Sequence, residues 1–109
     1  MAYDEGLAER IRERTTGRYP LAERKMFGGL CFLLDGNMAF GIVGSELMVR
    51  VGKDGYDDAL AQPHAREMDF TGRVSKGMVY VAEDGLGEDE DLDAWLDRGA
   101  AFAGSLPPK

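Results

Sequence analysis

The sequence is short of cysteine, histidine and long apolar runs, and each shortage excludes a class of protein. The single cysteine, Cys31, cannot form a disulfide within the chain, which favours a reducing, cytoplasmic compartment. Uninterrupted apolar runs such as residues 30–34 are far too short to span a bilayer. Residues 1–14 are charged throughout and lack the apolar stretch of a signal peptide. We therefore expect a protein that is neither exported nor inserted in a membrane.

Positive charge is also in deficit. The 109 residues include 13 Lys and Arg against 20 Asp and Glu, which gives a net charge of −7 at pH 7. Residues 83–97 hold eight of the acids and no base, whereas the bases between residues 10 and 25 alternate with Glu9, Glu13 and Glu23. That early patch should be close to neutral, and the overall charge opposes binding to a polyanion. We expect no direct contact with nucleic acid.

The middle of the chain has the pattern of a three-stranded meander. Between residues 30 and 51, Asp35-Gly36 and Gly44-Ser45 separate three apolar segments, and both dipeptides favour two-residue hairpin turns. A two-residue loop fixes the pairing of its strands. The predicted pairs are Leu33 with Met38 and Ile42 with Leu47.

The alternation of side chains then places apolar residues on both faces of this predicted sheet. One face would carry Cys31, Leu33, Met38, Phe40, Ile42, Leu47, Val49 and Val51. The other would carry Leu30, Phe32, Leu34, Ala39, Gly41, Val43, Met48 and Arg50. Because a solvated sheet face is normally polar, we expect the second face to be covered in part.

Three kinds of cover are open for this second face. Helices divided between both faces would leave no interface. The small residues Ala39 and Gly41 would admit a helix or a second sheet, or would leave a shallow pocket. We favour a symmetric homodimer, on the general frequency of twofold assemblies. The candidate interface residues are Phe32, Leu34 and Met48.

Apolar residues at helical spacing predict helices over residues 3–16 and 92–103, and a short helix capped by Asp54 that ends before Pro63. Further strands are expected at residues 68–70 and 77–81, and the length of the loop between residues 70 and 77 stays open. The predicted order is α-β-β-β-α-β-β-α. No repeat or linker interrupts residues 1–109, so we expect a single domain.

In this order, several short motifs resemble the TfoX N-terminal domain family, named after a bacterial regulator of natural competence. The motifs are RKMFGG at 24–29, DGNM at 35–38, LMVRV at 47–51, MDFTGR at 68–73, KGMVYV at 76–81, AFA at 101–103 and SLPPK at 105–109, together with Tyr56, Leu60 and Trp95. The resemblance implies an α+β, two-layer sandwich with an antiparallel sheet, similar to secretion chaperones. It also implies a bacterial regulatory role with no known catalytic residues.

Catalytic and metal-binding residue types are sparse. A Cys-His nucleophile pair would need Cys31 and His64 to be adjacent, with the thiolate partly exposed. The predicted register places Cys31 among apolar residues, so we expect a buried, inert thiol. One cysteine and one histidine do not make up a usual metal-ligand set. We therefore expect no enzyme, no cofactor and no metal site.

One polar group is a candidate binding site. Four basic residues lie within thirteen positions around Asp69, namely His64, Arg66, Arg73 and Lys76. Basic side chains grouped near a turn can hold a phosphate or a partner's carboxylate. Alternatively, Arg66 and Arg73 pair with Asp69 or Glu67 across a hairpin.

Three functions stay open after this survey, and the third is an enzyme that uses His64 as a general base. In the first, the chain acts in regulation through contacts with a second copy or a regulatory protein, and the loop from Arg66 to Lys76 selects partners by charge. In the second, the chain is a small-molecule binding module. Arg50 would then anchor an anionic ligand between the sheet and the final helix, near Met48 and Trp95.

Overall fold

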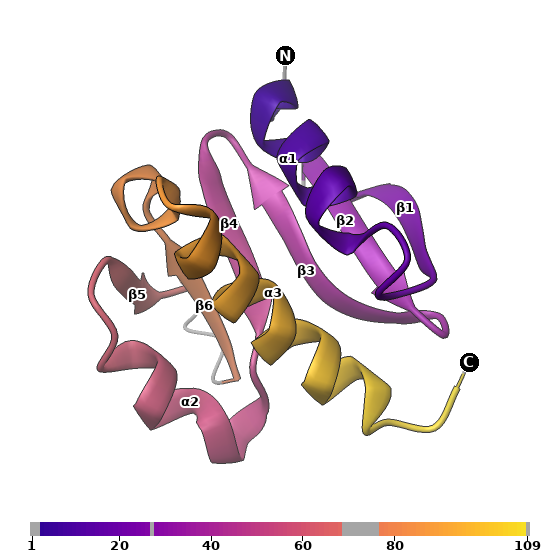
Figure 1. The fold of residues 1–109 in the computed structure, drawn as a ribbon. Helices are drawn as coiled ribbons and strands as arrows, with labels where there is room; N and C mark the ends of the chain where they lie inside the picture. The colour runs from indigo at the N-terminus through magenta and orange to yellow at the C-terminus, as the bar shows by residue number, and fades with distance from the viewer. Residues whose placement is uncertain (1–2, 27, 69–76, 109) are drawn as a thin grey trace.

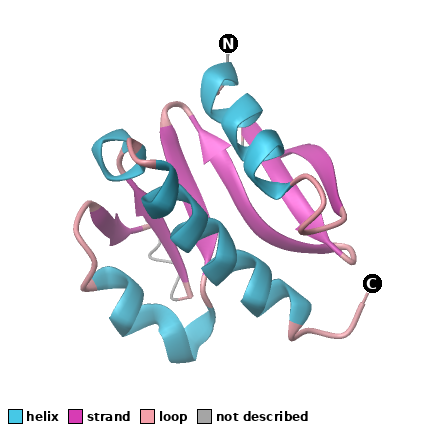
Figure 2. Cartoon of the chain, viewed as in Figure 1, coloured by secondary structure: helices cyan, strands magenta, loops and turns pink. Residues whose placement is uncertain are grey.

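The computed structural model describes residues 3–26, 28–68 and 77–108 (Figure 1). Its elements are α1 (Glu5–Thr15), β1 (Leu21–Met26), β2 (Gly29–Leu34), β3 (Asn37–Val43), β4 (Glu46–Arg50), α2 (Gly52–Leu60), β5 (Ala65–Glu67), β6 (Met78–Val81), the 3₁₀ helix η2 (Glu83–Leu86) and α3 (Asp89–Gly104). The strands form one antiparallel sheet in the order β1-β2-β3-β4-β6-β5. The α-helices lie together on one face of it (Figure 2). The predicted α+β, two-layer architecture with an antiparallel sheet is confirmed.

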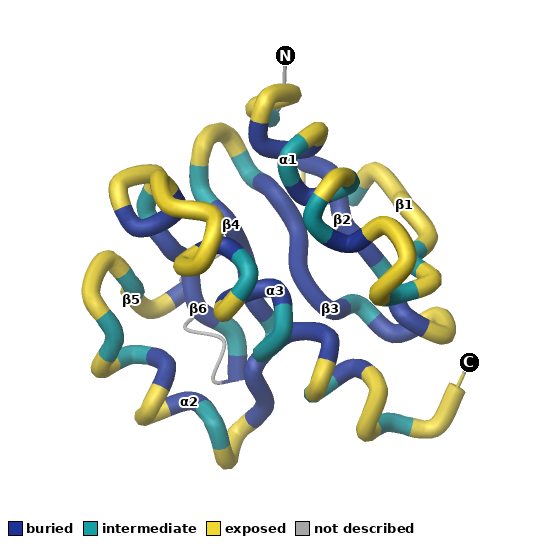
Figure 3. Tube along the Cα trace, viewed as in Figure 1, coloured by how far each residue is buried: buried dark blue, intermediate teal, exposed yellow. Residues whose placement is uncertain are grey.

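Strand β1, at one edge of the sheet, is missing from the predicted order. Its sequence, LAERKM, has charged residues at three consecutive positions, and most of the strand is exposed (Figure 3). It pairs with β2 along its whole length, from Leu21 opposite Leu34 to Met26 opposite Gly29. Charged side chains suit an edge strand because they oppose pairing with other chains. The same charges break the apolar alternation by which strands are predicted, so the sequence analysis did not find this strand.

The two predicted hairpins are confirmed. The pairs in the structure are Leu33 with Met38 and Ile42 with Leu47. Asp35 and Gly36 have φ of 53° and 84°, the left-handed conformations that a type I′ turn requires. Directly after this turn, the buried side chain of Asn37 donates a hydrogen bond of 3.0 Å to the carbonyl oxygen of Pro107. That bond fastens the C-terminal segment to the hairpin.

A β-bulge at Ala39 changes the predicted faces of the sheet. Phe32 lies opposite Phe40, but the next residue, Leu33, lies opposite Met38. Ala39 is therefore an extra residue on β3. As a result, the side chains of β2 lie on the opposite faces from those that the prediction gave them relative to the end of β3 and to β4.

Because of this exchange, Phe32, Leu34 and Met48 do not share a face. Phe32 and Leu34 are buried in the cluster that includes the helices, whereas Met48 is buried in a separate cluster on the opposite face. Their predicted placement together on one uncovered face is wrong, because it rested on unbroken alternation along β2 and β3.

The backbones of helix α3 and strand β3 come into close contact at Gly99 and Ala39. A Cβ added at Gly99 would lie 2.4 Å from the backbone oxygen of Ala39 and 2.9 Å from the ring of Phe40. The prediction that Ala39 admits a closely packed helix is confirmed. The shallow pocket is not found at Gly41, because a Cβ added there would lie 3.2 Å from the sulfur of Cys31.

Two element boundaries differ from the prediction. Helix α2 begins at Gly52, so Asp54 lies in its first turn instead of capping it. The strand expected at residues 68–70 falls mostly outside the described part, and the structure has β5 just before it. The expected loop up to Lys76 also lies outside that part. No helix within the described ranges is long and apolar enough to cross a bilayer.

Replacing Gly99 with alanine should lower the free energy of unfolding by about 1–3 kcal/mol, because the backbone oxygen of Ala39 cannot rotate away as a side chain can. Denaturant titration followed by circular dichroism measures this change. Gly55→Ala is the matched control, since an added Cβ inside α2 would meet Val51 Cβ at an ordinary 3.8 Å. The control should gain about 0.5–1 kcal/mol from helix propensity. A Gly99→Ala chain as stable as the native one would contradict the close crossing.

Candidate functional site

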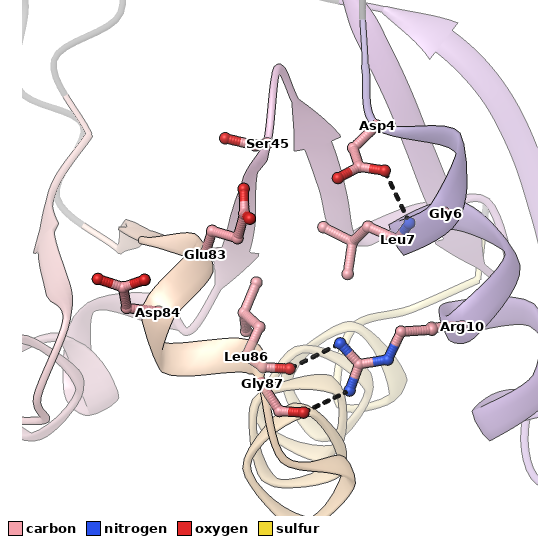
Figure 4. Close-up of a pocket in the computed structure, with 9 residues that line it drawn as sticks. All are labelled: Asp4, Gly6, Leu7, Arg10, Ser45, Glu83, Asp84, Leu86 and Gly87. Atoms are coloured by element: carbon pink, nitrogen blue, oxygen red, sulfur yellow. Dashed lines mark hydrogen bonds between the residues drawn. The ribbon is translucent and has the colours of Figure 1, made fainter.

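A cavity of about 510 Å³ opens between the start of α1, the β3–β4 turn and η2 (Figure 4). It is lined by Asp4, Gly6, Leu7, Arg10, Ser45, Glu83, Asp84, Leu86 and Gly87. Arg10 is held in the wall, where its Nη1 donates to the Leu86 carbonyl oxygen at 2.7 Å and its Nη2 to Asp89 at 3.1 Å. Within the described residues, Glu83 and Asp84 form no ion pair. The cavity is therefore net acidic and unsuited to an anion.

A second cavity, of about 270 Å³, lies beside His64. Its lining residues are Gln62, Pro63, His64, Asp84, Gly85, Asp91, Ala94, Trp95 and Arg98. His64 has a left-handed φ of 68°, and its carbonyl oxygen accepts a 2.9 Å hydrogen bond from the Ala82 amide. Among the described residues, the lining contains no Ser, Thr or Cys that a general base at His64 could activate. Cys31 lies on the other face of the sheet.

A ladder of ion pairs joins α1 to α3. Its rungs are Arg10 with Asp89, Arg14 with Asp93 and Arg18 with Asp97. In the middle rung, the two hydrogen bonds from Arg14 to Asp93 are 2.9 and 2.5 Å long. They hold the pKa of the Asp93 carboxyl below its usual value and raise the pKa of the Arg14 guanidinium.

The ladder corrects the expected pairing of the early bases. The sequence analysis noted only that these bases alternate with glutamates; among the described residues, Arg12 pairs with two of those glutamates, Glu9 and Glu23. The signal for the ladder is present in the sequence, because its arginines and aspartates each recur every four residues. Arg10, Arg12, Arg14 and Arg18 are thus all paired with carboxylates, and the expectation of no contact with nucleic acid stays a prediction.

The predicted basic site is not assembled by the described residues. Arg66 makes a bidentate pair with Glu46 at 2.6 and 3.2 Å and lies 4.6 Å from the centre of the Tyr80 ring. Arg50 lies over the ring of Phe102, at 5.2 Å, and lines neither cavity above. His64 borders the second cavity. Arg73 and Lys76 fall outside the described residues, so their predicted roles stay predictions.

The predicted ligand site between the sheet and α3 is also not formed as expected. Met48 and Trp95 belong to different clusters on opposite faces of the sheet. Without Met48, the residues named for that site no longer surround one space. The structure therefore does not form the anion site as it was predicted, and binding of an anionic ligand stays untested.

The sheet face opposite the helices carries a sulfur-rich cluster, which we call the methionine face. Cys31, Met48, Met68 and Tyr80 are buried in it, and Met26, Met38, Val43 and Met78 pack against them half-buried. One row of cross-strand partners spans this face from edge to edge, namely Arg24, Cys31, Gly41, Met48, Tyr80 and Arg66. Burial raises the pKa of the Cys31 thiol to about 11, which agrees with the predicted buried and inert cysteine.

Tyr56 of α2 carries an unsatisfied polar atom. Its side chain is buried in the helix-covered core, and within the described part of the chain its hydroxyl has no hydrogen-bond partner. Burial raises the pKa of this hydroxyl, with smaller contributions from the charges of Glu67 and Asp57. The hydroxyl lines none of the cavities above, so we treat it as a cost to stability.

Three comparisons with known proteins bear on the class of this chain. Residues 13–103 match the family described as TfoX N-terminal domain, which covers most of the chain. No curated protein and no solved structure matches it. Among the described residues, no three or more His, Cys, Asp or Glu side chains gather as a metal site would require.

Asp93→Asn should lower the free energy of unfolding at neutral pH. Because Arg14 lowers the folded-state pKa of Asp93 below its ordinary 3.8, the ionised carboxylate stabilises the folded chain above that pH. The stabilisation is lost as the pH falls through the folded-state pKa. Urea titrations between neutral and strongly acidic pH should therefore show the native chain and the variant converging.

Asp91→Asn is the control for this comparison. Asp91 lies on the same helix and is exposed, and it forms no ion pair within the described ranges. Its stability difference from the native chain should be smaller at neutral pH. A pH-independent effect of Asp93→Asn would show that the ladder contributes no stability through charge.

Tyr56→Phe should leave the free energy of unfolding unchanged or raise it by up to about 1 kcal/mol, because it removes a buried hydroxyl that has no partner. Tyr19→Phe makes the same chemical change where the hydroxyl donates to Asp97 at 2.6 Å, and it should lower stability. Thermal and denaturant unfolding of both variants measures the contrast. Equal losses in the two would mean that the Tyr56 hydroxyl has a partner in solution.

Proposed function

Because the chain belongs to the TfoX N-terminal domain family over residues 13–103, we propose that it is a bacterial, cytoplasmic regulatory domain that acts through protein contacts and not through catalysis. The family supports a domain like those of competence regulators. In support of a non-enzymatic role, the described lining of the His64 cavity holds no Ser, Thr or Cys, and the Cys31 thiol is buried. The proposal includes no cofactor and no direct contact with nucleic acid.

The observation that carries this proposal is the exposed apolar surface on the methionine face. Met26, Met38, Val43 and Met78 are only half-buried there, and so is Leu33, the cross-strand partner of Met38. An outward sheet face normally carries polar side chains at such positions. Methionine adapts its shape to a partner surface more readily than branched side chains do. This face is therefore suited to docking.

We assign a second copy of the chain as the occupant of this face. Arg24, at the β1 edge, is exposed and forms no hydrogen bond or ion pair with any described residue. Glu46 lies on β4, two strands in from the opposite edge, where it pairs with Arg66 of the edge strand β5. A twofold axis parallel to the strands would bring Arg24 of each copy to the Glu46 of the other, with the methionines between the two sheets. The face is thus complementary to itself in charge.

Size-exclusion chromatography with light scattering tests this assembly. The native chain should be a dimer, and Leu33→Glu or Met38→Glu should give a folded monomer, because a carboxylate would be buried in the interface. Arg24→Glu should raise the dissociation constant at least about tenfold by placing like charges together. Ala101→Glu, on the exposed side of α3, is the matched control and should leave the dimer intact.

The outcomes separate this proposal from its alternatives. A native chain that stays monomeric at every concentration would refute the dimer. A monomer that retains an anionic small molecule in native mass spectrometry would favour the binding module. Phe32→Glu and Leu34→Glu should unfold the chain, since both residues lie in the helix-covered core.

A further inference from the structure

Methionine is confined to one side of the sheet. The sequence has six methionines, of which Met1 lies outside the described residues. The other five belong to the methionine face, and the helix-covered core contains none of them. Leucine and isoleucine fill that core, so hydrophobic burial alone does not require methionine. The two faces of the sheet therefore differ in chemistry, because a thioether can be oxidised and a hydrocarbon side chain resists the same oxidants.

The methionines of this face differ in exposure. Met48 and Met68 are buried. Met26, Met38 and Met78 are half-buried and lie on β1, β3 and β6, and we call these three the accessible methionines. Their strands are distributed across the sheet, from the β1 edge to the strand beside β5. The accessible methionines therefore extend over the same surface that we assign to the second copy.

We propose that hydrogen peroxide regulates this surface by converting the accessible methionines to sulfoxides, an inference that rests on the dimer proposed above. In this reaction the peroxide O–O bond breaks, one oxygen atom forms a bond to the methionine sulfur, and the other leaves as water. The sulfur loses two electrons and the peroxide gains them, so no further co-reactant is needed.

A sulfoxide opposes the contact between copies because of its polarity. The S=O group is polar and accepts hydrogen bonds, whereas a thioether is only a weak acceptor. The neighbouring half-buried residues Leu33 and Val43 have no donor in their side chains. A sulfoxide covered by the second copy would thus lose its bonds to water without replacement. Oxidation should raise the dissociation constant of the dimer at least about tenfold.

Assembly and oxidation exclude each other at this surface. The accessible methionines are open to solvent in the free chain, and the second copy would cover them. The oxidant therefore reacts with the free chain, and the sulfoxide then opposes reassociation. The rate of oxidation per chain should fall as the protein concentration rises above the dissociation constant. A rate that is the same at every concentration would contradict protection by the second copy.

Graded exposure to hydrogen peroxide, followed by peptide mass spectrometry and light scattering, tests the switch. The accessible methionines should each gain one oxygen atom before Met48 and Met68 do. The dimer should then dissociate into monomers whose circular dichroism stays native, and methionine sulfoxide reductases should restore it. A dimer that persists after all three accessible methionines are oxidised would overturn the inference.

Conservative variants assign the effect to particular sulfur atoms. A chain with Met26→Leu, Met38→Leu and Met78→Leu keeps its apolar volume, so it should dimerise and stay dimeric in peroxide. Met38→Gln introduces a polar group of similar length and should raise the dissociation constant at least about tenfold without any oxidant. Met48→Leu and Cys31→Ala are the matched controls, since they remove buried sulfur atoms and should keep the native sensitivity. Dissociation of the triple leucine variant in peroxide would refute the role of the accessible methionines.

These measurements distinguish failure of the switch from failure of the dimer. A chain that is monomeric at every concentration before oxidant is added would refute the dimer, and the switch with it. A native dimer whose dissociation constant does not change on oxidation would refute the switch alone.

Discussion

The close crossing of α3 over β3 is the contact on which the rest of the packing depends. Gly99 brings the helix backbone against the carbonyl of Ala39, which is the extra residue of the β-bulge in β3. With the helix this close, Trp95 and Leu96 on one side and Ala103 on the other are buried against the strands. Glycine disfavours a helix interior, so its position there is explained by packing and not by propensity.

The bulge also decides what each face of the sheet contains. It turns Phe32 and Leu34 toward the helices and leaves Cys31 and Met48 on the side without them. One face thus becomes a conventional aliphatic and aromatic core. The other becomes an adaptable, sulfur-rich surface, on which the proposed contact between copies depends.

The sequence was a good guide where structure is local and a poor one where it depends on tertiary contacts. The turn at Asp35-Gly36 follows from two residues that accept left-handed backbone conformations, so the hairpin register could be predicted. The bulge at Ala39 leaves no such local signal. Strand β1 was missed because its sequence has no apolar alternation. It forms a strand because it pairs with β2.

The candidate site follows the same division. Burial of Cys31 could be predicted, because every neighbour in its strand is apolar. The prediction that Phe32 and Leu34 share a face with Met48 was wrong, because the bulge changes the alternation of side chains along β3. Arg66 pairs with Glu46, which comes from a strand twenty residues earlier, whereas the alternative pairing with Asp69 lies outside the described residues. The spacing of residues around Arg66 does not indicate that Glu46 is its partner.

The ion-pair ladder has a consequence for how the chain is made. Each rung joins residues that are 79 positions apart, so α1 leaves the ribosome long before α3 exists. The strands of the meander can pair during synthesis, but the arginine side of the first helix gains its partners only when the last helix emerges. The contact between α1 and α3 therefore cannot form before α3 has been synthesised.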